Sequence, residues 1–516
     1  MLLVLNKDLI LVVDFGAQYS HLIARRIRDQ GVKSEIVPYN ISIDNILALN
    51  PKGIIFSGGP ASIYSANAPK PNPEILNLDI PILGICYGLQ FIVDQKGGKV
   101  VSTKTREYGK SELLLNNKSN LFSDVKNKSI IWMSHSDKIV KINDDFEVLS
   151  HTSNSPYAAI KIKNKNIFGV QFHPEVIHTK CGNQIFDNFV YKICNCNANW
   201  QMDDLIDEKI NIIKNMVGSN KVLCAVSGGV DSTTAAVLLN QALGKNLYCV
   251  FVNHGLLREG ESKRVVDLLK NKLKLNLTYV DASKSFLSKL QGIQDPEKKR
   301  KIVGNEFIEV FSRVAKDIGK FKWLVQGTLY PDIIESAVTN SLTSKIKSHH
   351  NVGGLPEKMN LKLIEPFKDL YKDEVRKIAK ILKLPRQLIY GHPFPGPGLS
   401  VRIIGEITNN KIKICRHASA IIEQELINTK LYDKVWQAFA IIGDDKAVGI
   451  LGDQRHYGYV VTIKILESED AMTADWTRLP YKILEKISNR ITNEVNDVTL
   501  VTYAVSSKPP STIEPQ

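Results

Sequence analysis

Two kinds of hydrophobic pattern alternate along most of this chain. Short, almost continuous apolar runs are typical of buried strands, and amphipathic stretches with apolar residues at helical spacing lie between them. The apolar runs predict strands at 10–14, 53–57, 80–85, 129–133, 167–172, 222–226, 247–252 and 322–326. The amphipathic stretches predict helices at 18–30, 182–194, 203–217, 231–243, 259–272, 297–317 and 371–382. Buried strands that alternate with helices indicate parallel sheets with helices on both faces.

Two interruptions divide this pattern into three parts. A polar stretch runs from Asn195 to Asp204, and prolines and glycines exclude regular structure from Gly391 to Gly398. We therefore expect an α/β protein of two consecutive doubly wound, mostly parallel-sheet domains and a small C-terminal α+β domain, with boundaries at 1–198, 199–391 and 392–516. In the last part, residues 459–466 alternate like a strand with one buried face, which suits either a core or a two-fold interface.

Composition narrows the class of protein. The 516 residues are 43% hydrophobic and 23% charged, which is typical of a globular protein, and no apolar run approaches the ~18 residues of a membrane span. The net charge is +14, but the lysines are scattered, so we interpret them as a solvated surface rather than a nucleic-acid face. The seven cysteines form neither a disulfide framework nor paired metal-ligand spacing, which fits a reducing, cytoplasmic setting.

The segment 222–243 carries the first chemical signal. An apolar strand ends in a glycine-rich turn and passes directly into a helix, which presents free backbone N–H groups to an anion. The turn lacks the Gly-Lys-Ser/Thr ending of the kinase-type phosphate loop, and an ordinary turn of small residues is the alternative interpretation. It resembles the Ser-Gly-Gly-x-Asp-Ser loop of ATP pyrophosphatases, which split ATP into AMP and pyrophosphate. The resemblance implies that the ATP phosphates are bound by Ser227, Gly228, Gly229, Val230, Asp231, Ser232 and Thr233.

The second signal is a cysteine at a strand end. The run 82–85 leads into Cys86, and a helix is expected to begin at Gly88, so the helix dipole would favour a thiolate. A free thiol still needs a base. His173 and Glu175 follow another predicted strand, where His173 could take the thiol proton and Glu175 could orient the imidazole. Taken singly, the cysteine is equally compatible with a small buried apolar residue and the histidine with simple loop chemistry.

Together, Gly84-Ile85-Cys86-Tyr87-Gly88-Leu89-Gln90 and Phe172-His173-Pro174-Glu175 resemble the motifs of class I glutamine amidotransferases. The resemblance covers roughly residues 8–195. It implies that Cys86 attacks the glutamine amide and forms a thioester while ammonia leaves. It also implies an oxyanion hole made by the backbone N–H groups of Gly59 and Tyr87. Such fixed donors commonly contribute ~10²–10³ in rate.

Almost the whole chain resembles the glutamine-hydrolysing GMP synthetase family. The segments that carry this resemblance are 14–16 with Gln18 and Tyr19, 255–258, 326–332, 347–356, 392–399 and 507–510. It implies that xanthosine 5′-monophosphate (XMP) is adenylated by ATP and then aminated to GMP by ammonia from glutamine. Because free ammonia is mostly protonated in neutral water and then non-nucleophilic, we expect a path between the two sites that is shielded from water. It implies XMP contacts at Arg258, Gln437, Lys508 and Glu514. It further implies Mg²⁺ with the nucleotide, no organic cofactor, no metal site otherwise, a cytoplasmic homodimer, and neither a nucleic-acid nor a membrane partner.

Several assignments stay open at this stage. Lys298, Arg300 and Lys301 could approach the pyrophosphate or form a charged helix face, and the family resemblance makes His349 and His350 part of a mobile lid. A tRNA-modifying ATP pyrophosphatase would suit the basic charge but leaves Cys86 unexplained. A glutamine or nucleotide sensor with a decayed site conflicts with intact candidate catalytic residues.

Overall fold

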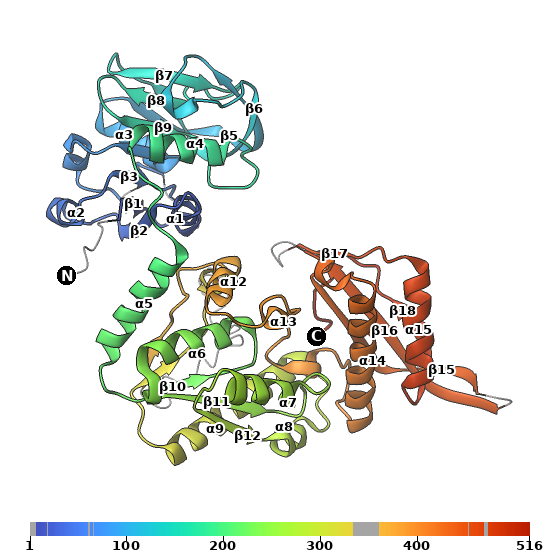
Figure 1. Ribbon diagram of the computed structural model, residues 1–516. Coiled ribbons are helices and arrows are strands. Elements are labelled where there is room, and N and C mark those ends of the chain that lie inside the picture. Colours follow the sequence, from blue (N-terminus) through green and yellow to red (C-terminus); the bar gives the residue numbers. More distant parts are fainter. Residues whose placement is uncertain are drawn as a thin grey trace. The chain divides into compact units, whose positions relative to one another are not determined.

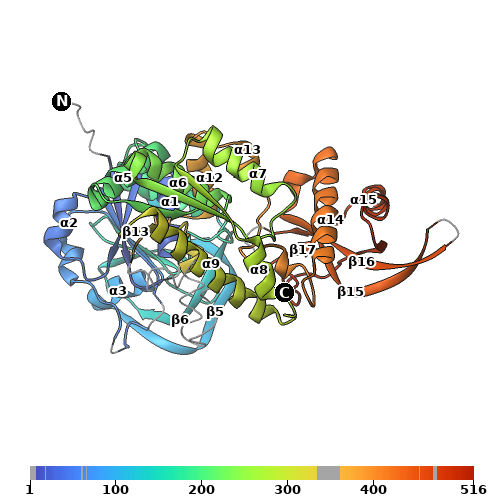
Figure 2. The same cartoon turned by 90° about the horizontal axis from the view of Figure 1, so that it is seen from below.

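The computed structural model describes residues 7–333 and 361–516, apart from 18, 60, 61, 66, 452, 453 and 469–472. The segment 347–356, with His349 and His350, therefore lies outside the described residues, as does Gln18. The chain divides into two compact units, Met1–Leu205 and Ile206–Gln516, which we call the N-terminal and C-terminal units. Figure 1 shows the elements of each unit, and Figure 2 shows them in a second view.

The N-terminal unit is built on a 9-stranded sheet with the order β2-β1-β3-β4-β9-β8-β7-β5-β6. The first five strands in this order are parallel, and each remaining neighbour pair is antiparallel. The strands are β1 (Leu9–Asp14), β2 (Lys33–Pro38), β3 (Gly53–Phe56), β4 (Ile82–Ile85), β5 (Lys99–Leu115), β6 (Ser129–Lys141), β7 (Phe146–His151), β8 (Ala159–Ile162) and β9 (Ile167–Val170).

Helices cover both faces of the parallel part of this sheet. They are α1 (Ser20–Asp29), α2 (Ile43–Leu49), α3 (Tyr87–Gln95) and α4 (Gly182–Asp187), which continues as a π-helical turn (Asn188–Ile193). Along β1, Ile10 and Val12 share a core with α1 and α4, whereas Leu11 and Val13 share a core with α2 and α3. Because side chains alternate along a strand, a sheet covered on both faces needs continuous apolar runs, which is the pattern in the sequence.

The C-terminal unit contains a 5-stranded parallel sheet with the order β12-β11-β10-β13-β14. Its strands are β10 (Val222–Ala225), β11 (Leu247–Asn253), β12 (Leu277–Asp281), β13 (Trp323–Val325) and β14 (Lys362–Ile364). The strand order reverses between β10 and β13. Ligands of doubly wound sheets bind outside the carboxyl ends of the strands at such a switch point. The glycine-rich turn 227–229 follows β10, so it lies at that position.

The helices of this part of the chain are α6 (Val230–Leu243), α7 (Glu261–Val266), α8 (Ser283–Leu290), α9 (Pro296–Ile318), α12 (Lys372–Ile381) and α13 (Arg386–Ile389). They are preceded by α5 (Met202–Val217), which begins in the N-terminal unit and ends in the C-terminal unit. A π-helical turn (Asp267–Lys272) extends α7. The start of α9 is set locally: Asp295 accepts a hydrogen bond from the backbone N–H of Lys298, and Pro296 occupies the first turn. Phe286 of α8 and Val310 of α9 pack with Leu223 and Leu324 of the sheet.

The rest of this unit is a second, mainly antiparallel sheet with two helices on one face. Its elements are α14 (Asn409–Asn428), β15 (Gln437–Leu451), β16 (Gln454–Glu467), β17 (Asp475–Trp476), α15 (Tyr481–Glu494) and β18 (Val498–Tyr503), and β15 and β16 form the long hairpin in both views (Figures 1 and 2). Val461 and Ile463 of β16 pack against α14 and α15 in the same hydrophobic cluster that contains Leu223. The parts of the chain before and after residue 391 therefore share one hydrophobic core.

The predicted fold class is confirmed, and each predicted strand and helix is present. The predicted helices 182–194 and 259–272 each end in a π-helical turn, and α3 begins at Tyr87 rather than Gly88. The predicted strand 129–133 extends to Lys141 in the structure. Its second half was not predicted because the residues after Met133 alternate between buried and partly exposed positions and form no continuous apolar run. Within the described residues, every helix is too short or too polar to cross a bilayer.

Candidate active site

Cys86 occupies a strained turn between β4 and α3. Its φ is 52° and its ψ is −101°, in a left-handed region that costs free energy for a residue with a Cβ. Close packing enforces the turn, since a Cβ at Gly84 would lie 2.7 Å from the backbone carbon of Gly88. A Cβ at Gly88 would lie 2.6 Å from the backbone oxygen of Phe56 on β3. The two glycines flanking Cys86 are therefore steric requirements of a nucleophile elbow.

His173 and Glu175 lie in the loop after β9. The Nδ1 atom of His173 is 2.7 Å from Oε1 of Glu175, and both side chains are buried. The backbone N–H of His173 donates to the carbonyl oxygen of Trp132 at 3.0 Å, and the Thr179 hydroxyl donates to the His173 carbonyl at 2.6 Å. The imidazole is thus oriented by a buried carboxylate and by two backbone contacts.

The electrostatics of this histidine involve Cys86. Burial lowers the pKa of His173, but the negative charge of Glu175 and a hydrogen bond with the Cys86 side chain outweigh burial and raise this pKa well above its ordinary value. The sulfur also lies 3.6 Å from Nε2 of Gln171 and 3.9 Å from the carbonyl oxygen of Ser134. Because an imidazolium beside a sulfur favours the thiolate, the pair suits nucleophilic chemistry.

Gly59 and Tyr87, the predicted oxyanion-hole residues, are packed against each other. A Cβ at Gly59 would lie 3.0 Å from Cγ of Tyr87. Ser57 connects the surrounding loops: its hydroxyl accepts from the N–H of Phe15 and its carbonyl accepts from the N–H of Gly88. Burial raises the pKa of Tyr87 to about 12, so its side chain stays a neutral phenol. Their role as backbone donors stays a prediction.

A buried Glu107–His135 pair, which was not predicted from the sequence, lies near the thiol. Nε2 of His135 lies 3.4 Å from Oε2 of Glu107, and Ser111 and Thr152 donate hydrogen bonds to the other carboxylate oxygen. Burial raises the pKa of Glu107, but these hydrogen bonds, led by that of His135, lower it overall. His135 follows Ser134, whose carbonyl faces the Cys86 sulfur. Glu107 and His135 meet through the register of β5 on β6, so no local sequence pattern pairs them.

The predicted phosphate loop lies at the carboxyl end of β10. Gly228 has a φ of 81°, and a Cβ there would lie 2.5 Å from Val265. The hydroxyl of Ser232 accepts from the N–H of Ser227 at 3.2 Å and lies 2.9 Å from the Ser227 hydroxyl, which closes the loop. Helix α6 begins at Val230, so the remaining residues of the loop, through Thr233, form its first turn. This geometry can bind an anion at a helix N-terminus.

Asp231 in this loop has a cationic neighbour that the sequence did not reveal. Nζ of Lys372, at the start of α12, lies 3.6 Å from Oδ2 of Asp231. Burial raises the pKa of Asp231, an effect that the charge of Asp332 increases and those of Lys372 and Arg376 reduce. Oδ1 of Asp231 is buried and has no hydrogen-bond partner among the described residues. Two carboxylates and a lysine beside a phosphate loop suit a nucleotide and its divalent cation.

Three of the four predicted XMP contacts lie together in the C-terminal unit. Arg258 donates hydrogen bonds to the carbonyl oxygens of His392 (2.7 Å) and Pro393 (3.1 Å). Gln437 donates to the same Pro393 oxygen at 3.0 Å and to the Glu514 carboxylate at 2.9 Å. The loop 392–398, which the sequence marked by its prolines and glycines and by the family resemblance, therefore connects these residues.

Lys508, the fourth predicted contact, is held differently. Its backbone N–H and carbonyl both pair with the backbone of Ala474, at 2.7 and 3.1 Å. The tail that follows it is held by Lys464, which donates to the carbonyl oxygen of Thr512 at 2.6 Å. Arg402, which the sequence analysis did not single out, binds the carboxylate of Glu514.

The charged start of α9 contacts the end of the chain. The Lys299 ammonium donates to the carbonyl oxygen of Ile403 at 2.7 Å and to the side-chain oxygen of Gln516. Arg300, which the sequence placed either near pyrophosphate or on a solvated face, donates to the backbone oxygen of Gln516. Burial, followed by the charge of Lys411, lowers the pKa of Lys299 to about 8.

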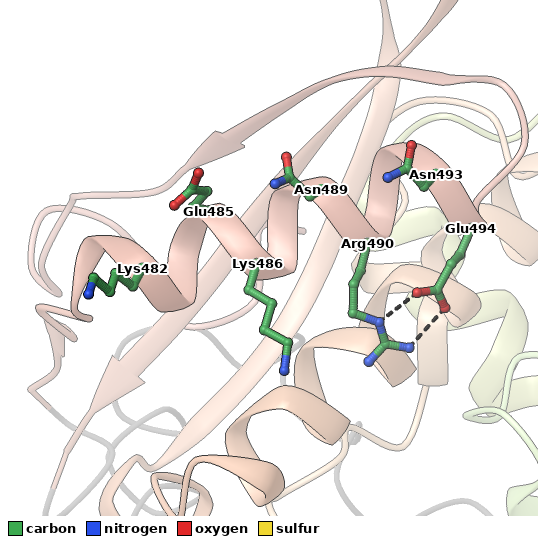
Figure 3. Close-up of a pocket in the computed structure, with 7 residues that line it drawn as sticks. All are labelled: Lys482, Glu485, Lys486, Asn489, Arg490, Asn493 and Glu494. Atoms are coloured by element: carbon green, nitrogen blue, oxygen red, sulfur yellow. Dashed lines mark hydrogen bonds and ion pairs between the residues drawn. The ribbon is translucent and has the colours of Figure 1, made fainter.

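A hollow of about 280 Å³ lies along one face of α15 (Figure 3). It is lined by Lys482, Glu485, Lys486, Asn489, Arg490, Asn493 and Glu494. Arg490 is hydrogen-bonded to Glu494, and both Lys486 and Arg490 pair with the buried carboxylate of Glu425 on α14. These charges already compensate one another, and none of the predicted site residues lines this hollow.

Comparison with known protein families divides the chain in three. Residues 11–193 match the model described as glutamine amidotransferase class-I. Residues 202–385 match the PP-loop domain, and residues 424–515 match the GMP synthase C terminal domain. The first match contains Cys86 and His173, and the second contains the loop after β10.

Comparison with curated proteins extends over nearly the whole chain. The chain is 54% identical over 505 residues to the GMP synthase [glutamine-hydrolyzing] of Aquifex aeolicus, with 98% of this chain and 99% of the relative covered. It is 51% identical over 510 residues to the protein of the same name from Caldanaerobacter subterraneus subsp. tengcongensis, with 99% of each covered. The corresponding Clostridium kluyveri protein is 50% identical over 510 residues, covering 99% of this chain and all of the relative (100%). The chain belongs to the family of glutamine-hydrolysing GMP synthases.

Proposed function

We propose that this enzyme converts XMP to GMP with nitrogen from glutamine, and that it cleaves ATP to AMP and pyrophosphate. One observation carries the proposal. The chain has a cysteine–histidine–glutamate constellation on one parallel sheet and a Ser-Gly-Gly-Val-Asp-Ser loop at the switch point of another. It also matches curated relatives over at least 98% of this chain and 99% of theirs. An ammonia-producing site and an adenylating site together account for an amination.

In the glutamine half-reaction, the Cys86 sulfur attacks the side-chain amide carbon of glutamine. His173 receives the thiol proton and donates a proton to the departing nitrogen, while Glu175 holds the imidazole in position. Backbone N–H groups of Gly59 and Tyr87 stabilise the tetrahedral oxyanion. Ammonia leaves, and water then hydrolyses the glutamyl thioester to glutamate and regenerates the thiol.

In the synthetic half-reaction, the carbonyl oxygen at C2 of the XMP base attacks the α-phosphorus of ATP. Pyrophosphate leaves, held by the loop 227–233, and the oxygen becomes part of an adenylate. Ammonia then attacks C2, and AMP departs with that oxygen. Adenylation is needed because a carbonyl oxygen is a poor leaving group. Lys372, adjacent to Asp231, is placed to neutralise phosphate charge by charge-assisted hydrogen bonds.

Mg²⁺ is the divalent cation that we propose for the ATP site. Asp231 fits this role because one of its carboxylate oxygens is buried and lacks a hydrogen-bond partner among the described residues. Asp332 lies close enough to raise the pKa of Asp231, so it adds negative charge beside the loop. Carboxylate oxygens are hard ligands of the kind that Mg²⁺ binds, together with substrate phosphates. When bound, the ion would neutralise charge on the departing pyrophosphate.

We propose that XMP is bound by Arg258, Gln437, Lys508 and Glu514, and that the three domains are 1–198, 199–391 and 392–516. We further propose a cytoplasmic homodimer. The C-terminal sheet supports the dimer because its hairpin and β18 expose large apolar side chains. They are Val448 (67% exposed), Ile450 (79%), Tyr457 (63%) and Leu500 (45%).

An isotope experiment tests the proposal. The full chain is incubated with XMP, Mg-ATP and glutamine labelled at the amide nitrogen, and the label is sought on the exocyclic amine of the purine. Cys86→Ala should abolish glutamine use but spare GMP formation from ammonium salt. The matched control is Cys181→Ala, another buried cysteine of the same unit, whose thiol pKa burial raises to about 11.

Two results would overturn the proposal. ATP cleavage that does not depend on XMP would remove the assigned substrate, and unlabelled product would remove the glutamine route. An ammonia scavenger in the solvent addresses the transfer step. Complete loss of glutamine-dependent synthesis in its presence would contradict a path for ammonia that is shielded from water.

A further inference from the structure

The carboxylate of Glu514 is held by a buried arginine. Nε and Nη2 of Arg402 each donate a hydrogen bond of 3.0 Å, one to each oxygen of Glu514. Gln437 donates a third hydrogen bond, at 2.9 Å, to Oε1. The Arg402 residue is 2% exposed, and the Glu514 side chain retains 14% exposure. The pair therefore has a shielded cation and a carboxylate that still reaches the surface.

Aromatic rings fix the guanidinium itself. The Cζ atom of Arg402 lies 4.0 Å from the ring centroid of Phe439 and 5.0 Å from that of Phe394. The Phe394 ring also carries the guanidinium of Arg258, at 4.6 Å. A planar guanidinium suits such stacking together with bidentate recognition of a carboxylate, and a lysine ammonium does not. Arg402 and Phe394, which have no assigned role, thus connect Arg258 with Gln437 and Glu514.

Glu514 can accept about one further hydrogen bond. An ionised carboxylate offers about four lone-pair positions, and three of these are occupied by Arg402 and Gln437. With the donors of the described residues counted, about one acceptor position, on Oε2, is left for a further donor. The backbone of the same segment is held by Lys464, through the carbonyl oxygen of Thr512. Glu514 is consequently fixed in orientation and retains capacity for one N–H or O–H group.

Stability alone is a weak reason for such a pair. Burying two charges costs desolvation free energy that the mutual attraction often does no more than offset. We propose that Arg402 is a positioning residue for XMP recognition: it fixes Glu514 so that its remaining acceptor position receives one hydrogen-bond donor of the nucleotide. This inference rests on the proposed function, because it requires XMP to be the ligand of Glu514.

The test uses the full chain and steady-state kinetics with XMP, Mg-ATP and ammonium salt. Arg402→Lys keeps the charge but loses the bidentate, stacked geometry, so KM for XMP should rise about 10- to 100-fold, the range expected when a charged hydrogen bond is lost. KM for ATP and glutamine hydrolysis by the other half of the chain should stay within about twofold, since neither involves Glu514. Arg386→Lys is the matched control, because Arg386 pairs with Asp433 on the exposed surface.

A double-mutant cycle separates positioning from a merely structural role. If Arg402 acts through Glu514, Arg402→Lys combined with Glu514→Gln should raise KM for XMP no further than the worse single variant does. The inference would be overturned if the effects of the two substitutions on KM for XMP multiply in the double variant. It would also be overturned if Arg402→Lys leaves KM for XMP within about twofold of the parent. If Arg402→Lys does not fold, Phe439→Leu loosens the guanidinium without removing a charge, and an unchanged KM for XMP in that variant would also overturn it. Failure of the parent enzyme to use XMP would instead refute the proposed function.

Discussion

Gly88, two residues after the proposed nucleophile Cys86, gives a sharp test of the elbow geometry. Gly88 lies in the first turn of α3, where an alanine would ordinarily stabilise the helix by roughly 0.5–1 kcal/mol. Here the added Cβ would lie 2.6 Å from both the Cβ and the backbone oxygen of Phe56, about 0.8 Å inside ordinary contact. Overpacking of this kind typically costs 1–3 kcal/mol. The clash therefore outweighs the gain in helix propensity, and Gly88→Ala should destabilise the N-terminal unit.

The added Cβ of Gly88→Ala should also lower activity, because β3 and α3 must move apart to accommodate it. The atoms that meet the new Cβ belong to β3, which leads into the predicted oxyanion hole, and α3 begins with Tyr87. A displacement of about 1 Å in an active site can cost roughly 10²-fold in rate. We expect Gly88→Ala to lower glutamine-dependent GMP synthesis by about 10- to 100-fold. Ammonium-dependent synthesis should be preserved, because it uses the C-terminal unit.

The assay compares these two rates and the thermal unfolding midpoint. Gly304→Ala is the matched control: Gly304 is also a helical glycine, in α9, and a Cβ there meets nothing within 4 Å. That variant should gain stability by roughly 0.5–1 kcal/mol. A Gly88→Ala enzyme with a raised midpoint and the parent's glutamine-dependent rate would refute the steric reasoning.

Three further predictions concern charged groups. The pKa of His173 is raised in the folded state, so protonated His173 stabilises the fold below about pH 6.5, and this stabilisation is lost as pH rises through the folded-state pKa. The difference in melting temperature between the parent and Glu175→Gln should therefore be largest in acid and become smaller as pH rises. A constant gap would contradict this. Burial, followed by the charge of Arg416, lowers the pKa of His254 to about 4. The free energy of unfolding should therefore fall by up to about 3 kcal/mol as pH falls from about 6.5 to 4. In calorimetry, His254→Asn should lose less stability than the parent over that pH range. Equal acid sensitivity would refute it. Lys372→Met should raise KM for ATP about 10- to 100-fold in a pyrophosphate-release assay while ATP-independent glutamine hydrolysis stays unchanged, and an unaltered KM would exclude Lys372 from phosphate binding.

The sequence was most informative where one local pattern determines the structure. Strands buried on both faces appear as apolar runs, and β1, β4 and β10 were predicted for that reason. The edge strands β2 and β12 were missed because most of their residues are only partly buried, which leaves no apolar run. The order strand, turn, helix likewise placed Cys86 and the loop 227–233 at strand ends.

The sequence by itself therefore determined the layered α/β fold, the elbow around Cys86 and the glycine-rich loop after β10. Tertiary structure alone decided which other distant side chains meet: Lys372 beside Asp231, the cross-strand pair Glu107–His135, and the ion pair between Arg402 and Glu514. The physical reason is the range of the interactions. Hydrophobic periodicity and glycine sterics act between neighbours along the chain, whereas hydrogen bonds and ion pairs form only after packing has brought remote segments within about 3 Å of each other.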